Sequence, residues 1–124
     1  MGTIKKLDWN NLKHEYGVDG QRLLPWNGNA QSPFPFGGAY CICRSKTDSL
    51  AHVNSPADEE EMFIVISGKA LVNINGEMTE MNQGDIVHIP AGDHHYVSNP
   101  FDEDFHFYAL WWNGEILSEH TNKK

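Results

Sequence analysis

The chain has 124 residues, of which 40% are hydrophobic and 21% are charged, so it has the size and composition of one globular domain and not of a disordered protein. Its net charge of −8 disfavours binding to nucleic acid or to an anionic membrane, because no basic stripe is present to meet phosphates. No stretch approaches the roughly 18 apolar residues of a membrane span, and no apolar run follows Lys5 and Lys6 as in a secretory signal. We therefore expect a cytoplasmic protein.

Residues 1–38 are predicted to form a short helix followed by an extended arm. Asp8 can cap a helix of about two turns, in which Trp9, Leu12 and Tyr16 share one face and Gly17 marks the end. Prolines between positions 20 and 38 then favour an extended conformation. The arm carries three aromatic side chains that need packing partners: Trp26, Phe34 and Phe36. They cover the following β-domain or a partner subunit, or they form a lid over the mouth of the site.

Eight short segments separated by turns predict β-strands, at residues 39–44, 49–54, 62–66, 70–74, 77–81, 85–89, 95–98 and 105–112. Asn75-Gly76 is the strongest hairpin signal, since both residues tolerate the positive φ angles of a type I′ turn. Strands of this length and spacing indicate an all-β sandwich or closed barrel. The segment 105–108 is expected to pair antiparallel with the strand at 95–98.

The end of the chain and the two cysteines have simpler interpretations. Asn113-Gly114 is expected to turn the chain into a last short strand at residues 115–118, so that the β-domain covers 39–118 and a polar tail covers 119–124. Cys41 and Cys43 lie two residues apart on one face of a strand, which is a poor arrangement for a disulfide. We interpret them as reduced thiols in packing, with a metal or redox role as the alternative.

The stretch from Gly84 to Asn99 carries the most specific motif. A glycine is followed by five residues, Pro-x-Gly, two residues, a histidine, three residues and an asparagine; the fixed positions are Gly84, Pro90, Gly92, His95 and Asn99. This pattern resembles the second signature of the cupin superfamily. The resemblance implies a small double-stranded β-helix, or jelly-roll, barrel with His95 as one ligand of a metal held inside it.

A second cluster resembles the first cupin signature, His-x-His followed by a glutamate and then, after six residues, a glycine. Glu61 and Gly68 have this spacing. His52-Val53-Asn54 stands in for the two histidines, with about two extra residues in the loop that follows, an insertion that costs little. The resemblance implies His52 as a ligand, and Asn54 at the position of the second histidine.

Strand alternation decides which of the consecutive glutamates Glu59, Glu60 and Glu61 faces inward. Only every second side chain of a strand points to one face, so Glu60 and Glu61 cannot both point into the barrel without a bulge. Register favours Glu61, which shares a face with Phe63, and Glu60 remains the alternative ligand.

Two imidazoles and a carboxylate from His52, His95 and Glu61 form a donor set that suits a divalent metal ion. Fe(II) and Mn(II) are favoured, and Ni(II), Co(II) and Zn(II) also suit it; six-fold coordination would leave three positions for water, substrate or O2. The neutral amide oxygen of Asn54 would be a weak additional ligand. A site with open positions is typical of a reactive metal and not of a structural zinc site.

His106 and Tyr108 are the further candidates for catalysis. If His106 faces the cavity, it would act as an extra ligand or as an acid or base, and Tyr108 on the same face would orient a substrate through its hydroxyl group. The default for the aromatic strand that holds them is packing in a small barrel.

The resemblance implies a metal-dependent enzyme acting on a small polar metabolite, either a dioxygenase or a Lewis-acid isomerase or decarboxylase. A non-catalytic cupin module that binds a small ligand or metal is the alternative, and a metal-free isomerase is a third possibility. Small cupins are often homodimers, so we expect a homodimer in which the N-terminal arm contributes contacts. Fold alone does not choose among these functions.

Overall fold

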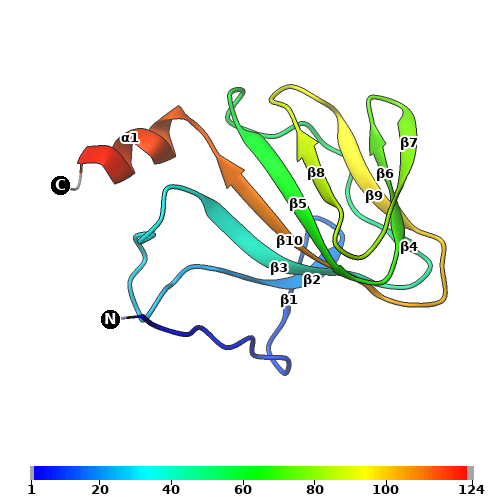
Figure 1. The fold of residues 1–124 in the computed structure, drawn as a ribbon, viewed down its shortest axis with the longest axis horizontal. Coiled ribbons are helices and arrows are strands. Elements are labelled where there is room, and N and C mark those ends of the chain that lie inside the picture. The colour runs from blue at the N-terminus through cyan, green and yellow to red at the C-terminus, as the bar shows by residue number, and fades with distance from the viewer. Residues whose placement is uncertain (1, 123–124) are drawn as a thin grey trace.

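The computed structural model describes residues 2–122, and ten strands in it form two sheets. The six-stranded sheet has the order β1 (Lys13–Glu15), β2 (Val18–Arg22), β3 (Gly37–Cys43), β10 (Phe105–Trp112), β5 (Glu60–Ser67) and β8 (Ile86–Ile89). The four-stranded sheet has the order β4 (Thr47–Asp48), β9 (His95–Asn99), β6 (Ala70–Ile74) and β7 (Glu77–Met81). Figure 1 shows the smaller sheet at one end of the molecule and helix α1 (Gly114–Asn122) at the other.

The core lies between the two sheets and follows from strand alternation. Every second residue is buried along β5 and along the first half of β10, as the pairs Phe63 and Val65 and Phe105 and Phe107 show. These side chains meet Val72 of β6 and Val97 of β9 in one cluster, and each such buried side chain contributes about 1.5–3 kcal/mol.

The prediction of a closed barrel is wrong, although the prediction of an all-β fold is confirmed. The hydrogen-bonded ladders of the two sheets remain separate within residues 2–122, with β1 and β8 at the edges of one sheet and β4 and β7 at the edges of the other. Edge strands β4 and β8 have only two and four residues. They are too short to continue a ladder from one sheet to the other.

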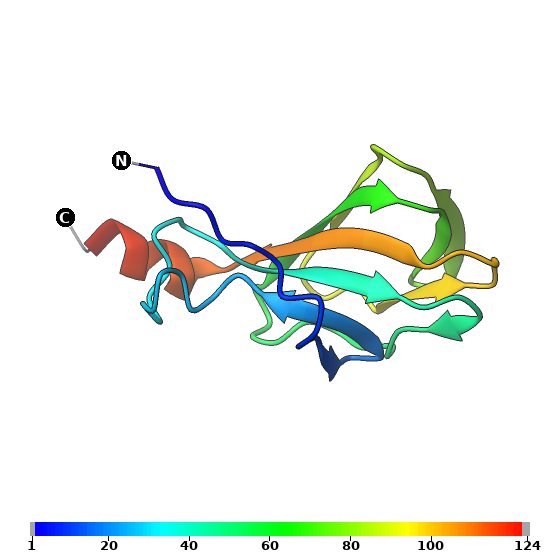
Figure 2. The same ribbon diagram turned by 90° about the horizontal axis from the view of Figure 1, so that it is seen from below.

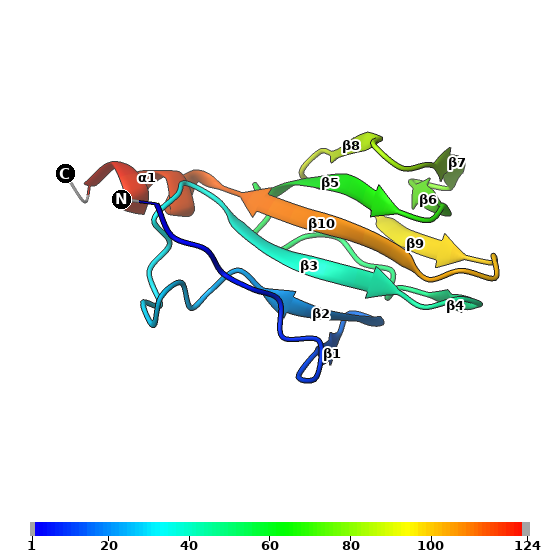
Figure 3. The same cartoon turned by 60° about the horizontal axis from the view of Figure 1, so that its bottom comes forward.

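The predicted N-terminal helix is replaced by a hairpin of β1 and β2. Tyr16 and Gly17 have φ angles of 54° and 80°, which turn the chain back on itself where the helix was expected to end. Asp8 does accept a hydrogen bond from the backbone N–H of Asn10, but only a turn follows. β2 pairs with β3, so part of the predicted arm belongs to the sheet. Figures 2 and 3 show the segment before β1 running outside this sheet.

The helix of this chain is at the other end, where a short strand at 115–118 was predicted. Asn113 caps α1, because its side-chain oxygen accepts a hydrogen bond from the N–H of Ile116 at 2.9 Å. The carboxylate of Asp58 accepts another from the N–H of Gly114, also at 2.9 Å. The helix replaces most of the predicted tail, and residues 123–124 of that tail lie outside the described residues. No helix within residues 2–122 has the length and apolar character needed to cross a membrane.

Two strand predictions also differ from the structure. β10 pairs with β3 and β5, not with the strand of His95, because the chain crosses from one sheet to the other between Asn99 and Phe105. Residues 49–54 form no regular strand and contribute only an isolated bridge between His52 and His95. The other predicted strands are present within a few residues of their expected bounds.

The aromatic side chains of the arm pack away from the main cavity. Phe34 stacks on Phe36 with ring centroids 4.7 Å apart, and Trp26 meets Phe34 edge to face. Phe34 and Phe36 line a smaller cavity of about 250 Å³ that lies against α1. Within the described chain these aromatics therefore form no lid over the larger cavity.

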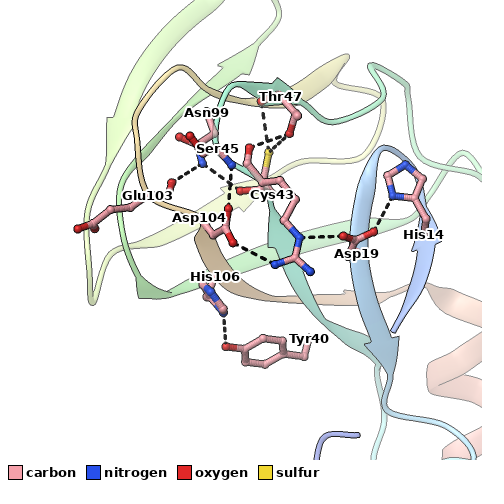
Figure 4. Close-up of polar contacts among 11 residues, drawn as sticks. His14, Asp19, Tyr40, Cys43, Ser45, Thr47, Asn99, Glu103, Asp104 and His106 are labelled. Atoms are coloured by element: carbon pink, nitrogen blue, oxygen red, sulfur yellow. Dashed lines mark hydrogen bonds and ion pairs between the residues drawn. The ribbon is translucent and has the colours of Figure 1, made fainter. Parts of the chain in front are cut away.

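A charged network centred on Arg44 ties β2 to β3 and to the loop before β10 (Figure 4). Nε of Arg44 lies 2.8 Å from Oδ2 of Asp19, and Nη1 of Arg44 lies 3.0 Å from Oδ2 of Asp104. Arg44 and then His14 lower the pKa of Asp19, and the N–H of Ser45 followed by Arg44 lowers that of Asp104. The network therefore stabilises the fold above the ordinary aspartate pKa and loses this contribution as the pH falls below it.

We expect Arg44→Gln to lower the free energy of unfolding by about 1 kcal/mol at pH 7, because two partly exposed ion pairs are lost. The loss should shrink at pH 3, below the ordinary aspartate pKa, where the contribution of the lowered pKa values diminishes. Urea denaturation at both pH values measures this, with Lys46→Gln as a control because Lys46 pairs with the exposed Asp102. An equal loss at pH 3 and pH 7 would show that the charges are not the cause.

Candidate ligand and metal site

A cavity of about 470 Å³ lies between the two sheets. Its deep part is apolar, with Phe63, Val97, Phe107 and Ala109 in the wall. One side carries most of the residues that the sequence singled out, His52, Asn54, Glu61 and His95, with Glu59 beside them. A cavity with an apolar interior and a few converging polar groups is typical of a small-molecule site.

His95 is the most deeply buried polar group of the cavity, at 2% exposure. It begins β9 directly after the turn that contains Gly92 (φ 88°). Its Nδ1 lies 3.0 Å from the carbonyl oxygen of Asp93, which can only accept, so Nδ1 carries the proton and donates it. Nε2 is then the ring nitrogen available to a ligand in the cavity, and within residues 2–122 this buried atom makes no hydrogen bond.

Glu61 supplies the negative charge opposite His95. Its Oε1 lies 3.2 Å from Nε2 of His95, an ion-pair distance without hydrogen-bond geometry. Burial disfavours the charged form of His95, but the Glu61 carboxylate and the Asp93 carbonyl together outweigh it and raise the pKa of His95 above its ordinary value. A proton or another cation between these two atoms would be favoured.

Asn54 contacts the same carboxylate, because its Nδ2 donates to Oε1 of Glu61 at 3.2 Å. The amide thus orients Glu61 through its N–H group, whereas the sequence suggested its oxygen as a weak ligand. The Glu60 side chain points away from the cavity. Its Oε1 lies 2.8 Å from Nε2 of His88, and its Oε2 accepts a hydrogen bond from the N–H of Ala91. The register predicted for β5 is confirmed in this respect: Glu61 faces the cavity and Glu60 does not.

His52 lies beside His95 through paired backbone hydrogen bonds, with N–O distances of 3.1 and 3.0 Å. The two ring centroids are 4.7 Å apart. Nδ1 of His52 also donates to a backbone carbonyl, that of Leu50 at 3.0 Å. Both imidazoles therefore donate their Nδ1 proton to the backbone, so Nε2 is the ring nitrogen that could bind a metal, the arrangement usual for metal-binding histidines.

The donors are neighbours but do not yet form a complete site. Among residues 2–122, no group of three or more His, Cys, Asp or Glu side chains is arranged so that it could hold a metal ion. His95 and Glu61 contact each other, and the ring of His52 lies beside that of His95.

Glu59 is a functional candidate that the sequence did not single out. Burial, followed by the charges of Glu61 and Asp58, raises its pKa from 4.5 to about 7, against a hydrogen bond from Asn113 that lowers it. The side chain therefore exchanges a proton near neutral pH. Its position beside a cavity and a second carboxylate is the signal, and that position depends on the fold.

We expect Glu59→Gln to stabilise the metal-free protein at pH 8 by about 1 kcal/mol and to leave it unchanged at pH 4. A raised carboxyl pKa means that the folded state holds the proton more tightly, so stability falls as the pH rises from 4.5 through about 7. Thermal unfolding in the presence of a chelator at several pH values measures this. The exposed Glu77→Gln on β7 is the control, and a pH-independent effect of Glu59→Gln would contradict the assignment.

The structure separates His106 and Tyr108 from this cavity. Both lie on the face of β10 opposite Phe107 and Ala109, and neither lines the cavity. Nδ1 of His106 lies 2.7 Å from the hydroxyl oxygen of Tyr40 (Figure 4). The rings of Tyr108 and Tyr40 pack against each other with their centroids 5.1 Å apart. The pairing of β10 with β3 and β5, which differs from the predicted pairing, fixes this orientation.

The sequence also missed the part of the cavity wall that comes from β1 and β2, because it assigned these residues to a helix and an arm. Tyr16, Val18 and Arg22 are among them. Cys41 lines the cavity too, and burial raises the pKa of its thiol to about 12, so it stays neutral. Both cysteines are buried and free, in agreement with the interpretation as reduced thiols.

Comparison with known proteins decides the family. Residues 46–112 match the family model of the Cupin domain, which is more than half of the chain. The protein belongs to the cupin family. This match includes His52, Glu61 and His95 and excludes β1, β2 and β3.

Two solved structures resemble this cupin over its whole length. The plu4264 protein from Photorhabdus luminescens is 43% identical, with a TM-score of 0.88 over 99% of this chain and 98% of that chain. A Cupin 2 conserved barrel domain protein from Salinispora arenicola is 31% identical, with a TM-score of 0.89 over 100% and 99%. Protein SCO3923 of Streptomyces coelicolor is 33% identical over 58 residues, 47% of this chain, and the matched region spans about half of that relative (51%).

Proposed function

We propose that this cupin binds one divalent metal ion, Fe(II) or Mn(II) in preference to Ni(II), Co(II) or Zn(II), through His52, Glu61 and His95. The observation that carries the proposal is Nε2 of His95: it is buried, it has no hydrogen-bond partner among the described residues, and it lies 3.2 Å from a carboxylate oxygen. An electron-rich pair of this kind in a buried site is stabilised by a cation.

The residues present fit such an ion in their chemistry. The Nε2 atoms of two imidazoles and one carboxylate are donors that these metals accept, and both imidazoles are oriented by backbone carbonyls. The side chain of Asn54 would hold Glu61 in place through its N–H group.

We further propose that the protein is a metal-dependent enzyme acting on a small metabolite, either as a dioxygenase or as a Lewis-acid isomerase or decarboxylase. A bound divalent ion supplies Lewis acidity, or redox chemistry toward O2, to a ligand oxygen. The apolar wall around Phe63 and Phe107 would exclude water and limit the size of the substrate. Glu59, with a pKa of about 7, is placed to take up or release a proton at the cavity wall.

The experiment is a calorimetric titration of the chelator-treated protein with Mn(II), Co(II), Ni(II) and Zn(II), and with Fe(II) under anaerobic conditions. Binding of one equivalent by the wild-type protein is the expected result. Oxygen consumption by the Fe(II) and Mn(II) forms, with candidate metabolites added, then separates the oxygenase from the Lewis-acid enzyme. Absence of binding for all five ions would contradict the proposal.

A non-catalytic cupin that binds a small ligand is the second candidate. The observation that favours it is the absence of a ready group of three metal donors among residues 2–122. In that case the cavity would retain an organic ligand in the metal-free protein, which native mass spectrometry of the purified protein detects.

A further inference from the structure

The part of the cavity wall outside the family match comes from the hairpin of β1 and β2. Lys13 and Glu15 of β1 and Val18, Gln21 and Arg22 of β2 line the cavity, whereas His14 and Asp19 pair with each other and do not line it. The family match begins at residue 46. The hairpin is therefore a feature that distinguishes this cavity from the shared part of the fold.

The hairpin is fixed in place and is not a loose flap. The carbonyl oxygen of Tyr16 accepts a hydrogen bond from the N–H of Leu50 at 2.7 Å. The centroids of the Tyr16 and His52 rings are 5.1 Å apart. A Cβ on Gly17 would lie 2.8 Å from the backbone nitrogen of Leu50, so the turn packs directly on the segment that leads to His52. A ligand in the cavity meets a preformed wall.

Arg22 is the group of this wall best suited to bind a ligand. Its Nε donates to Glu15 at 3.1 Å, and its guanidinium group lies 5.7 Å from the ring centre of Trp111, which also lines the cavity. Its two terminal nitrogens make no hydrogen bond to any of the described residues. The donors that form a planar fork toward a carboxylate are thus free while the side chain is held at its base.

The charges of the hairpin favour a ligand with a single negative charge. Glu15 pairs with both Arg22 and Lys13, at 3.1 and 3.2 Å, and these cations lower its pKa, so it remains ionised. Two cations and one anion leave one net positive charge on the cavity face of the hairpin, while the carboxylates of Glu59 and Glu61 line another part of the cavity. A monoanion balances it, whereas a phosphate dianion would not be fully compensated.

We propose that this hairpin selects the ligand of the cavity, and that Arg22 binds the carboxylate of a small monocarboxylate whose apolar part packs against Trp111 and Phe107. The proposal concerns the same cavity as the proposed function and names its ligand class, but it does not require a bound metal. If Arg22 served only to join the two strands of the hairpin through Glu15, its loss would affect stability and not ligand preference.

The test compares 3-phenylpropanoate with its uncharged amide, 3-phenylpropanamide, in NMR titrations of the chelator-treated and the metal-loaded protein. We expect the wild-type protein to bind the carboxylate at least about tenfold more tightly than the amide, since a charge-assisted contact is worth about one factor of ten or more. Arg22→Gln should abolish this preference and leave amide binding unchanged. Arg22→Lys, which keeps the charge without the fork, should retain part of it.

Arg44→Gln is the matched control, because it removes another arginine that holds β2, through Asp19, from a position outside the cavity. It should keep the full carboxylate preference. Equal binding of acid and amide by the wild-type protein, no binding of either, or an unchanged preference in Arg22→Gln would each overturn the proposal. Failure to bind metal would contradict the proposed function alone, since the carboxylate preference is measured without metal as well.

Discussion

Replacing Glu61 by glutamine should weaken binding of the divalent ion by at least about 100-fold, whereas the same change at the neighbouring Glu60 should leave it intact. Removing a residue that merely orients a ligand already costs about 10–100-fold in metal affinity, so the loss of a direct carboxylate ligand costs more. Glu61 contacts His95 inside the cavity, and Glu60 contacts His88 outside it. Calorimetric titration of both variants measures the difference.

The pair of variants is closely matched, because the two glutamates are adjacent on β5 and each change removes one negative charge. A general electrostatic effect on metal affinity would be similar for both. Equal weakening in Glu60→Gln and Glu61→Gln would therefore contradict a direct role of Glu61. Loss of binding in Glu60→Gln alone would instead support the alternative ligand that the sequence left open.

Asn99→Ala should destabilise the fold by about 3 kcal/mol, the largest effect we expect from a single polar side chain. Asn99 is fully buried at 0% exposure. Its Nδ2 donates to the carbonyl oxygens of Cys43 and Glu103 at 3.0 and 2.8 Å (Figure 4). Its Oδ1 accepts from the N–H of Phe101 at 3.1 Å. Alanine would leave three backbone groups without this partner at the point where the chain leaves the four-stranded sheet.

Urea denaturation of Asn99→Ala and of Asn82→Ala measures this effect. Among the described residues, the Asn82 side chain donates one hydrogen bond, to the exposed Glu80, so its replacement should cost less than about 0.5 kcal/mol. Asn99→Asp, which has the same shape but no N–H donors, should be at least as destabilising as Asn99→Ala. A loss below about 1 kcal/mol for Asn99→Ala would show that other groups replace its hydrogen bonds.

Local chemistry made much of the fold predictable. Asn75 and Gly76 have the positive φ angles, 52° and 90°, that the hairpin signal requires, and the strands on either side have the predicted bounds. The same logic failed where one signal fits two structures. Asn113-Gly114 was interpreted as a turn between strands, but the asparagine caps a helix. Tyr16-Gly17 was interpreted as a helix end, but it turns a hairpin.

The candidate site likewise has a part that the sequence predicts and a part that it does not. Alternation along β5 was enough to place Glu61 toward the cavity, because that decision depends on adjacent residues. Arg22 reaches the cavity only because β2 pairs with β3, and His106 is excluded from it because β10 pairs with β3 and β5. Such non-local pairings are set by packing over the whole domain, and sequence spacing does not contain them.

Elemental analysis of the wild-type protein and of His95→Ala, both purified without added metal or chelator, tests the metal centre most directly. The proposed function predicts close to one equivalent of a divalent ion, Fe or Mn in the first place, in the wild-type protein and its loss in the variant. The variant should remain folded, which circular dichroism checks. Equal metal content in the two proteins, or no metal in either even after titration with each ion, would contradict a metal centre built on His95.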